Sequence, residues 1–302
     1  MTPARRFLGA AAGLALDRLA GEPPAGHPVA AFGRLMAAAE ERLWHDSRGW
    51  GTAFAAGGVG LGAAAGAMLA STALATGVAV AGRALAVEAR AVAAALAAGD
   101  LGCAQARLPA LCGRDPEVLD DKGVARAAVE SVAENTVDAI VAPAFWAALG
   151  GAPGVGAYRA ANTLDAMVGH RSPRHLRFGW AAARLDDAAN WVPARLTAVL
   201  VAAVRPGAAG EVAAVLRHPP SHPSPNAAVS EGAFAAALGV RLGGDTVYRG
   251  RVDPRPTFGS GRAPDASDIE AAVRLSADVT AALAAGLAAL GLLAGGRGRW
   301  RR

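Results

Sequence analysis

Charged residues are scarce in this chain of 302 residues. They make up 18% of it, whereas roughly a quarter would be charged in an ordinary soluble domain, and hydrophobic residues make up 53%. Residues 49–82 contain no charge at all, a run long enough to cross a bilayer once. These absences argue against a soluble, alanine-rich helical protein and favour a membrane protein.

Lysine and cysteine are almost absent as well. Lys122 is the single lysine, so the net charge of +5 comes from arginines that are scattered along the chain and interleaved with acids. A nucleic-acid-binding surface would cluster its basic residues on one face with aromatic residues between them, so nucleic acid is set aside as a partner. Cys103 and Cys112 have no second pair for a zinc site, and both are expected to be reduced.

The chain also lacks strand patterns of useful length and the common nucleotide-binding motifs. It has neither the GxxxxGK[ST] phosphate loop nor a GxGxxG segment that opens a helix after a strand. The predicted fold class is therefore all-α: a polytopic helical membrane protein with folded helical loops. Any nucleotide would be bound by an unfamiliar mode.

The whole chain, 1–302, is predicted to form a single integral membrane domain. Apolar runs predict membrane segments near residues 7–20, 52–80, 139–158, 188–204 and 279–296, separated by polar segments at 83–138, 159–187 and 205–275. Prolines and glycines interrupt the segment 139–158. It is expected to be re-entrant or a buried hairpin, because such backbone is tolerated at membrane depth only where protein or water covers it.

Two further patterns concern the membrane segments. Gly58, Gly62 and Gly66 repeat every four residues, a spacing that either lets membrane helices approach closely or reflects the glycine-rich composition. Arg5 and Arg6 at one end and the tail "RGRWRR" at the other predict that both ends are cytoplasmic, hence an even number of spans. The first apolar run is expected to be a short retained helix rather than a signal peptide.

Acids nevertheless enter the apolar region at one place. Arg126, Glu130, Glu134 and Asp138 are spaced by four residues, which puts them in one stripe on a helix with Arg126 beside Glu130. Acids carried to the bilayer centre cost about 2.5 to 3.5 kcal/mol each. The stripe is therefore either a solvated helix face outside the bilayer or a site where the acids meet arginines, water or a metal ion.

A second polar group follows in "ANTLDAMVGHRSPRHLRFGWAAARLDDAANWVPAR" at 161–195. On a helix, Asp186 and Asn190 lie four residues apart, and Asp187 is followed at the same spacing by Trp191 and Arg195, so that acid, amide and guanidinium share a face. Mg²⁺ prefers one or two carboxylates with phosphate oxygens and water, and arginine binds phosphate through two donors. The two segments together suit a pocket for Mg²⁺ and phosphate groups.

Several motifs taken together resemble a known family. They are "LDRLAGEPPAGHPVAAFGRLM" at 16–36, "GRD" at 113–115, "ESVAENTVD" at 130–138, "NTLDAMVGH" at 162–170, "FGWAAARLDDAANWVPAR" at 178–195, "SPNAAVSE" at 224–231 and "LGGDTVYRG" at 242–250. In this order they closely resemble adenosylcobinamide-phosphate synthase, an integral membrane protein of cobalamin biosynthesis. The resemblance covers nearly the whole chain and is specific as a set, although each motif alone is weak.

The resemblance implies an ATP-dependent amide ligase with ATP and Mg²⁺ as cofactors. It would join adenosylcobyric acid to (R)-1-amino-2-propanol phosphate, or to a shorter amino-alcohol phosphate, and give adenosylcobinamide phosphate. The implied location is the bacterial inner (cell) membrane, as a multi-pass protein with a cytoplasmic site for ATP. Membrane lipid and other membrane enzymes of late cobalamin assembly are the further expected partners.

The expected site residues lie on these motifs. The catalytic set is Glu130, Glu134, Asp138, Asp186 and Asp187, of which Asp186, Asp187 and Glu134 are the expected metal ligands. The substrate-binding set is Arg114, Asp115, Arg126, Asn135, Asn162, Asp165, Arg184, Asn190, Arg195, Asn226 and Glu231. Which acid accepts the proton of the attacking amine stays open among Glu134, Asp138 and Asp165.

Two departures from the family pattern and one alternative function remain. Gly21-Glu22-Pro23 stands where the family has Gly-Asp-Pro, and Gly169-His170 stands where it has Gly-Tyr, which leaves the role of His170 unknown. His27, His218 and His222 are expected to cap turns or lie on the surface rather than bind metal. The alternative is a proton- or cation-coupled transporter, in which acids inside the membrane would relay charge, but no internal repeat supports it.

Overall fold

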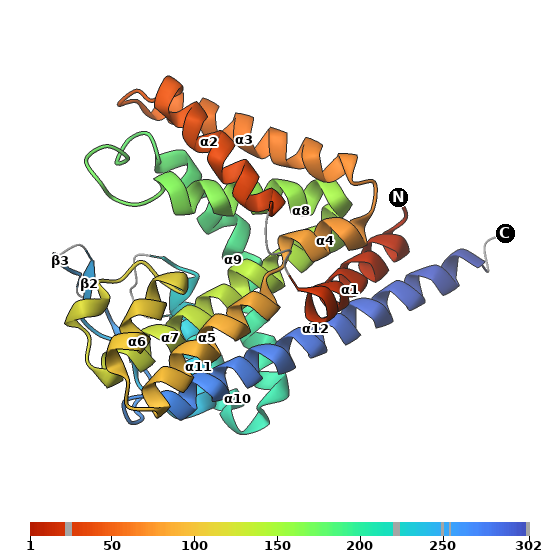
Figure 1. The fold of residues 1–302 in the computed structure, drawn as a ribbon. Helices are drawn as coiled ribbons and strands as arrows, with labels where there is room; N and C mark the ends of the chain where they lie inside the picture. Colours follow the sequence, from red (N-terminus) through yellow and green to blue (C-terminus); the bar gives the residue numbers. More distant parts are fainter. Residues whose placement is uncertain (22–25, 220–223, 249–250, 254, 300–302) are drawn as a thin grey trace. The chain divides into compact units, whose positions relative to one another are not determined.

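The computed structural model describes residues 1–21, 26–219, 224–248, 251–253 and 255–299, nearly all of them helical (Figure 1). The chain forms two compact units. The first consists of Met1–Ala81, Asp138–Asn190 and Leu283–Arg302, and the second of Gly82–Val137 and Trp191–Ala282. The prediction of one membrane domain over the whole chain stays a prediction.

The first unit is built around α8. Its helices are α1 (Pro3–Ala20), α2 (Pro28–Leu43), α3 (Arg48–Met68), α4 (Thr72–Ala79), α8 (Ala142–Val168), which follows a π-helical turn at Val137–Val141, and the first part of α9 (Trp180–Val204). Helices α1, α2, α3 and α4 all pack against α8. Phe54, Leu164 and Phe178 lie in the core between them and exclude water from it.

Three glycines let α3 lie directly against α8. An added Cβ would lie 2.8 Å from the Leu164 side chain at Gly58 and 2.5 Å from the Gly156 carbonyl oxygen at Gly62, and at Gly66 it would overlap the Ala152 carbonyl. The contacts run in opposite directions along the two helices, so α3 and this part of α8 are antiparallel. The four-residue spacing thus marks close helix approach, as one of the two interpretations of the sequence predicted.

The chain folds back inside α8. Gly151 has φ 65° and ψ −153°, a conformation outside the helical region that glycine adopts without a Cβ clash. An added Cβ at Gly154 would lie 2.6 Å from the carbonyl oxygen of Trp146, eight residues earlier, whereas a straight helix would separate such residues by about 12 Å. The segment 139–158 is therefore sharply bent, and its being re-entrant or a buried hairpin stays a prediction.

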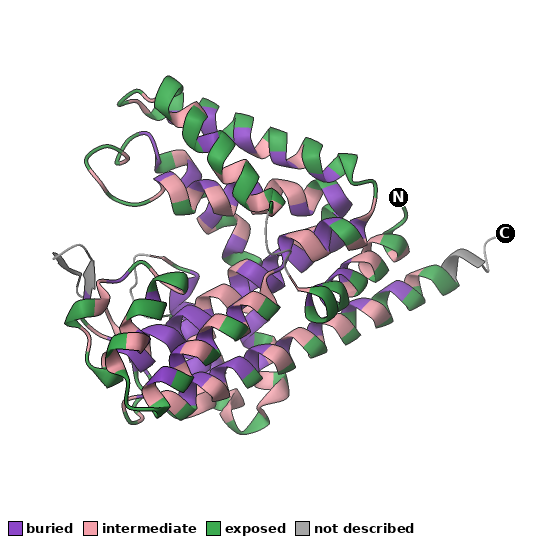
Figure 2. Ribbon diagram, in the orientation of Figure 1, coloured by how far each residue is buried: buried purple, intermediate pink, exposed green. Residues whose placement is uncertain are grey.

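The second unit is centred on α7 (Asp121–Thr136). Its other helices are α5 (Gly82–Ala97), α6 (Leu101–Arg107), α10 (Ala209–Arg217), α11 (Ala227–Leu238), the last part of α9 and the first part of α12 (Ala266–Arg299), with 3₁₀ turns at Leu108–Ala110, Pro116–Val118 and Pro206–Ala208. Helix α7 packs against α5, α6 and α11. Figure 2 shows α7 and α11 largely buried, which explains why α11 is apolar on every side.

Short strands and a buried helix occupy the region 205–275, which the sequence predicts to be a polar segment. Strand β1 (Leu242–Gly243) pairs antiparallel with β4 (Thr257–Phe258), and β2 (Thr246–Tyr248) pairs antiparallel with β3 (Arg251–Asp253). Strands of two or three residues are too short to display an alternating pattern, so the sequence could not reveal them.

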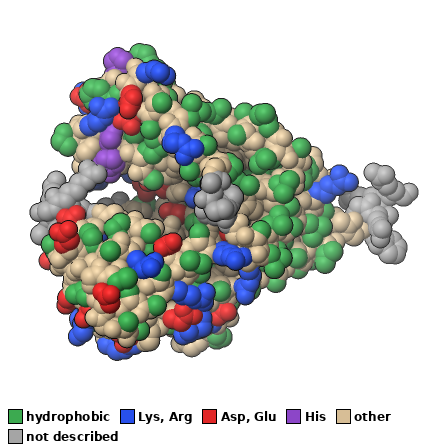
Figure 3. All heavy atoms as spheres, viewed as in Figure 1, with side chains coloured by type: hydrophobic (Ala, Val, Ile, Leu, Met, Phe, Trp, Pro, Cys, Tyr) green, Lys and Arg blue, Asp and Glu red, His purple; other side chains and the backbone are tan. Residues whose placement is uncertain are grey.

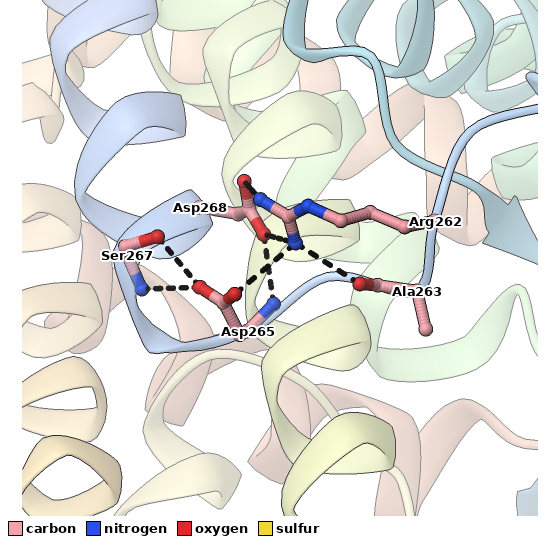
Figure 4. Close-up of polar contacts among 5 residues, drawn as sticks. All are labelled: Arg262, Ala263, Asp265, Ser267 and Asp268. Atoms are coloured by element: carbon pink, nitrogen blue, oxygen red, sulfur yellow. Dashed lines mark hydrogen bonds and ion pairs between the residues drawn. The ribbon is translucent and has the colours of Figure 1, made fainter.

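Helix α12 begins with a tightly bonded cap (Figure 4). The Asp265 carboxylate accepts hydrogen bonds from the backbone N–H and the hydroxyl of Ser267, at 2.9 and 2.6 Å, and the Asp268 carboxylate accepts one from the backbone N–H of Asp265 at 2.8 Å. Arg262 binds both oxygens of Asp268, at 2.7 and 2.9 Å. This reciprocal cap satisfies orphan N–H groups of the first helical turn and fixes where α12 starts.

Three helical stretches in the described ranges are long and apolar enough to cross a membrane. They are Arg48–Met68, Asp121–Val168 and Ala266–Gly296, and the pair Trp180–Val204 and Pro206–Arg217, bent by 118°, makes a fourth if it counts as one span. Asp121–Val168 does not run straight, because the chain reverses at Gly151. The chain is an all-α polytopic membrane protein, as predicted.

The structure redraws two of the predicted membrane segments. The segment 52–80 is divided, because α3 ends at Met68 and α4 begins only at Thr72, with Ala70 between them at φ 54°. The segment 7–20 lies in α1, which is not among the described helices that meet the length and hydropathy required of a span. Figure 3 shows hydrophobic side chains on the surface around α1 and α3. Leu8 and Leu16 of α1 and Leu61 of α3 are exposed.

Candidate active site

The predicted site residues fall into two groups, one in each unit. The first unit holds Asp138, Asn162, Asp165, Arg184, Asp186, Asp187 and Asn190. The second unit holds Arg114, Asp115, Arg126, Glu130, Glu134, Asn135, Arg195, Asn226 and Glu231. The expected metal ligands are therefore divided, because Glu134 belongs to a different unit from Asp186 and Asp187.

Asp186 on α9 is the centre of the first group. It is 9% exposed, and each of its carboxylate oxygens accepts one amide hydrogen bond, from Asn162 Nδ2 at 3.2 Å and from Asn190 Nδ2 at 3.0 Å. Asn190 lies one turn along α9 and Asn162 lies on α8, so the two helices orient the carboxylate together. Among the described residues no arginine, lysine or histidine forms an ion pair with Asp186.

Two other acids lie near Asp186. Asp165 on α8 is close enough to both Asp186 and Asp187 to feel their charges. Arg184 Nη1 lies 3.6 Å from Asp187 Oδ2, but the Arg184 side chain is 65% exposed, so solvent screens that pair. We call Asn162, Asp165, Asp186, Asp187 and Asn190 the amide–carboxylate cluster. It brings three carboxyl groups close to one another.

Tyr158 and Arg159 extend this cluster, and the sequence did not identify either as a site residue. The Tyr158 hydroxyl lies 2.8 Å from Asn190 Oδ1 and 3.1 Å from the backbone carbonyl oxygen of Asp138. Arg159 Nη1 donates to Asn162 Oδ1 at 3.2 Å. The fold-back at Gly151 thus brings Asp138 beside the α9 motif. Arg159 is the first charged residue after Asp138 in the sequence. This position at the end of an uncharged run is the signal that could have identified Arg159 as a site residue.

Glu130 and Arg114 form the centre of the second group. Both are nearly completely buried, Glu130 being 2% exposed, and Arg114 Nη2 donates to Glu130 Oε2 in an ion pair. Glu130 Oε1 accepts a hydrogen bond from the backbone N–H of Gly243 at 2.6 Å. The interpretation of the acidic stripe as a solvated helix face is therefore wrong for Glu130, since burial of an acid requires such partners.

The expected pairing of Arg126 with Glu130 is wrong as well. Arg126 donates to the backbone carbonyl oxygens of Gly243 and Asp245, at 2.5 and 3.0 Å, and so holds the β1 segment against α7. Glu130 pairs instead with Arg114, which precedes α7. Spacing along one helix could not reveal a partner supplied by a different segment.

Glu134 on α7 and Glu231 on α11 lie close enough for their charges to interact. Glu231 on α11 is 1% exposed, and burial, together with the charges of Glu134 and Glu130, raises the pKa of Glu231 well above its ordinary value. Arg114 and Arg255 lower it only in part. Arg255, which lies in the proline-rich segment, is a further neighbour that the sequence did not identify. We call Arg114, Glu130, Glu134 and Glu231 the guanidinium–carboxylate cluster.

The stripe of acids does not continue to Asp138. Residues Val137–Val141 form a π-helical turn, in which hydrogen bonds join residues five apart, so the helical register changes after Thr136. Counting by fours assumes a regular α-helix and therefore fails there. The two glutamates of the stripe meet in the guanidinium–carboxylate cluster, whereas Asp138 belongs to the other unit.

The remaining predicted residues have simpler contacts. Arg195 Nη1 donates to Asn226 Oδ1 at 3.2 Å, and its guanidinium lies 4.3 Å from the centre of the Trp191 ring. Asn135 Nδ2 donates to the backbone oxygen of Ser131 at 2.9 Å. Asp115 precedes the 3₁₀ turn at Pro116–Val118 without capping it. Arg195 and Asn226 thus form a pair that links α9 and α11.

The histidines follow the expected surface and capping roles where the structure describes them. His27 caps α2, because its Nδ1 accepts a hydrogen bond from the backbone N–H of Val29, and His218 is exposed at the end of α10. His170 Nε2 lies 3.0 Å from His175 Nδ1. His222 and the Glu22-Pro23 departure lie outside the described residues, and so does the end of the "RGRWRR" tail.

The fit to Mg²⁺ can be judged from the donors present. Within the described ranges, no three His, Cys, Asp or Glu side chains are grouped closely enough to enclose a metal ion. Mg²⁺ bound with a nucleotide needs only one or two carboxylates, since phosphate oxygens and water complete its shell. The oxygens of Asp186 and Asp187 are of the type that Mg²⁺ prefers, so these residues fit that mode and do not fit a site made of protein ligands alone.

Comparisons with known proteins cover the chain almost end to end. Residues 10–276 match the family model described as CobD/Cbib protein. The chain is 50% identical to cobalamin biosynthesis protein CobD of Mycobacterium tuberculosis strain H37Rv over 293 residues, which cover 92% of this chain and 94% of that protein. It is 43% identical to the protein of the same name from Stutzerimonas stutzeri strain A1501 over 291 residues, covering 89% and 92%. No solved structure matches significantly.

Proposed function

This chain belongs to the CobD/Cbib family of cobalamin biosynthesis proteins, and on that premise we propose that it is an ATP-dependent acid–amine ligase. It joins adenosylcobyric acid to (R)-1-amino-2-propanol phosphate and gives adenosylcobinamide phosphate. The observation that supports this reaction is the amide–carboxylate cluster, because its buried Asp186 is oriented by two amides and is not paired with a cation among the described residues. Such a site stabilises an incoming cation, whether Mg²⁺ or the ammonium of the amine.

A carboxylate does not react with an amine at neutral pH. ATP, when bound, would convert the carboxylate to an acyl phosphate; the amine nitrogen then forms the new C–N bond while the C–O bond to phosphate breaks and phosphate leaves. The attacking ammonium must lose one proton before it reacts and the amine a second after the bond forms. Acids held in fixed orientations can accept these protons.

The residues of this chain have separable roles in the proposal. Asp186 and Asp187 would hold Mg²⁺ through carboxylate oxygens, with nucleotide phosphates supplying other ligands. Asp165, next to both, is placed to accept a proton from the amine. Asn162 and Asn190 position Asp186 through their amide hydrogen bonds. The protein thus contributes mainly orientation and charge neutralisation.

The guanidinium–carboxylate cluster has a different proposed role. Arg114 is already paired with Glu130, so this cluster is not a free phosphate site. Glu231 Oε1 is buried and lacks a hydrogen-bond partner among the described residues, and the carboxyl group of Glu134 lies near Glu231. A polar substrate with both donors and acceptors, such as the amide-rich corrinoid, would satisfy these groups. We place the whole reaction at the cytoplasmic side of the bacterial cell membrane, where ATP is available.

The direct test is amide formation by the purified protein in detergent. Adenosylcobyric acid, aminopropanol phosphate, ATP and Mg²⁺ are supplied together, and product is scored by mass spectrometry. We expect amide formation that requires the nucleotide. Undiminished product after nucleotide removal rejects the ligase, and ion flux in liposomes without any amide product would establish the transporter alternative.

A matched pair of variants tests the acid cluster within this assay. Asp187→Asn removes one charge from the cluster, while Asp46→Asn removes an acid that, like Asp187, pairs with an exposed arginine: Asp46 Oδ2 lies 3.7 Å from Arg177 Nη1. Each acid pairs with a largely exposed arginine, so yield should stay near normal for both variants. We expect activity to fall at least about a hundredfold only for Asp187→Asn. Equal activity of the two variants would remove Asp187 from the site.

A further inference from the structure

A cavity of about 620 Å³ lies between α2 and α8, entirely within the first unit. Its polar lining consists of His27, Arg34, Arg159 and Thr163, and the rest is small or apolar, including Met167. None of the lining residues that the structure describes is an acid. A pocket of this size suits a small molecule, and its charge is positive.

The cationic groups of this pocket are not neutralised by the described protein. Arg34 forms no hydrogen bond or ion pair with any described residue, and the Nε of Arg159 is buried without a partner. Among the described residues, the Arg159 side chain donates a hydrogen bond only to the neutral amide oxygen of Asn162. A buried guanidinium nitrogen without an acceptor is costly, so an anion that enters the pocket would be stabilised.

Two further features favour an anion in the same place. The Nδ1 atom of His27 accepts the backbone N–H of Val29 at 3.3 Å, so in the neutral ring the proton lies on Nε2, which is then a donor. Val29 and Ala30, in the first turn of α2, also line the cavity, and the N-terminus of a helix favours negative charge. Every ionisable group in the lining is therefore a donor.

We infer that this pocket of Arg34, Arg159 and His27 binds the phosphate group of a small-molecule substrate. Arginine guanidinium groups match phosphate oxygens in geometry and charge. Because this inference rests on the proposed function, phosphate could come from the amine substrate or from the nucleotide. Lipid headgroups are a third source of the same chemistry.

The neighbouring cluster favours the amine substrate. Arg159 binds Asn162, and Asn162 binds Asp186, so one asparagine joins the cationic pocket to the amide–carboxylate cluster. Aminopropanol phosphate carries an ammonium and a phosphate on adjacent carbons, and the two sites offer complementary charges through this short connection. A nucleotide has no ammonium to match the acids.

The test is binding without turnover, measured by isothermal titration calorimetry on the full chain in dodecyl maltoside. The probes are aminopropanol phosphate, aminopropanol, inorganic phosphate, ADP and phosphatidylglycerol micelles. The variants are Arg34→Gln and Arg159→Gln, and the control is Arg42→Gln, an exposed arginine eight residues further along α2 that does not line the cavity. Arg34→Gln breaks no described contact, so it reports binding without a folding defect.

We expect aminopropanol phosphate to bind about tenfold more weakly to both pocket variants and unchanged to the control, with no binding of aminopropanol. Equal affinity for all variants overturns the site. If the pocket variants lose only the binding of ADP, or only the binding of lipid, while they bind aminopropanol phosphate as before, the amine substrate is not the occupant of the pocket. Binding that depends on the pocket in a protein that makes no amide would reject the proposed ligase and leave the pocket intact.

Discussion

At the scale of single residues, burial decides which charges matter. Glu130 is buried and depends on Arg114, whereas Arg126, which the sequence places next to Glu130, binds backbone carbonyl groups. Asp186 is buried too, but amides rather than arginines orient it. A buried carboxylate is therefore paired with a guanidinium group in one cluster and held by two amides in the other.

The first prediction concerns Arg114. Arg114→Ala leaves Glu130 buried without its cation and should lower the free energy of unfolding by about 3 to 5 kcal/mol. Arg126→Ala removes two hydrogen bonds to carbonyl groups and should cost less, about 1 to 3 kcal/mol. Denaturant unfolding in detergent measures both.

Adding Glu130→Gln to Arg114→Ala is the control, because it removes the unpaired charge and should recover part of the lost stability. If the single Arg114 and Arg126 variants are equally unstable, the buried ion pair does not have the role that its geometry indicates.

The second prediction concerns the pH dependence of stability. Glu40 on α2 lies 2.9 Å from His175 Nε2 and 3.1 Å from Arg174 Nε. Burial alone would raise the pKa of Glu40. The hydrogen bonds and charges of His175 and Arg174 outweigh burial and hold this pKa below its ordinary value. When an acid has a lower pKa in the folded state than in the unfolded state, it stabilises the folded protein at pH values above its unfolded-state pKa. This contribution is lost as the pH falls through the folded-state pKa.

The unfolding temperature of Glu40→Gln should therefore be lower than that of the unchanged protein at about pH 6. This difference in unfolding temperature should shrink between about pH 5 and about pH 3. Glu41→Gln alters the exposed neighbour on the same helix and serves as the control. A difference that stays constant down to about pH 3 would contradict the ion-pair explanation.

At the scale of the elements, two backbone features place the site helices. Glycines at the α3–α8 contact allow the helices to touch, and Gly151 reverses the chain so that Asp138 lies beside Asn190 through Tyr158. Neither feature carries chemistry. Both determine whether side chains far apart in the sequence meet.

The third prediction tests the α3–α8 contact. Gly62→Ala places a Cβ 2.5 Å from the Gly156 carbonyl oxygen and should destabilise the protein by about 1 to 3 kcal/mol. Gly60→Ala, on the same helix with nothing within 4 Å of the added Cβ, should be neutral or slightly stabilising, because alanine favours helices over glycine by about 1 kcal/mol. Yield and thermal unfolding in detergent compare them. Similar losses in both variants would show that the close α3–α8 contact does not explain the effect.

At the scale of the whole molecule, the membrane limits how the chain can be arranged. Three described helical stretches qualify as spans, or four with the bent pair, and exposed leucines cover α1 and the end of α12. The expectation that both chain ends are cytoplasmic stays a prediction. A reversal inside Asp121–Val168 changes how that stretch is counted, because a folded-back helix can return to the side from which it entered.

The fourth prediction follows from this reversal. In a background with Cys103→Ser and Cys112→Ser, single cysteines at Asp138 and Arg184 should react with an impermeant maleimide from the same side of the membrane. The reason is that Tyr158 contacts both the Asp138 carbonyl and Asn190, one and a half turns beyond Arg184 on α9. Labelling from opposite sides would show that the chain crosses between them.

The sequence by itself determined the class of the protein and its family. Scarce charge and long apolar runs require burial in lipid, so they determine a helical membrane protein without any tertiary information. The ordered motifs identified the family. The four-residue spacing of Asp186 and Asn190 also predicted a hydrogen bond that the structure contains, because it depends only on one regular helix.

Tertiary structure alone decided which of these residues meet. Arg114 reaches Glu130 from outside α7, Arg159 approaches Asp186 through an asparagine on α8, and the π-helical turn separates Asp138 from the stripe that contains Glu134. Each case involves a contact between distant segments or a local break in helical register. Periodicity describes one regular helix, so it carries no information about either.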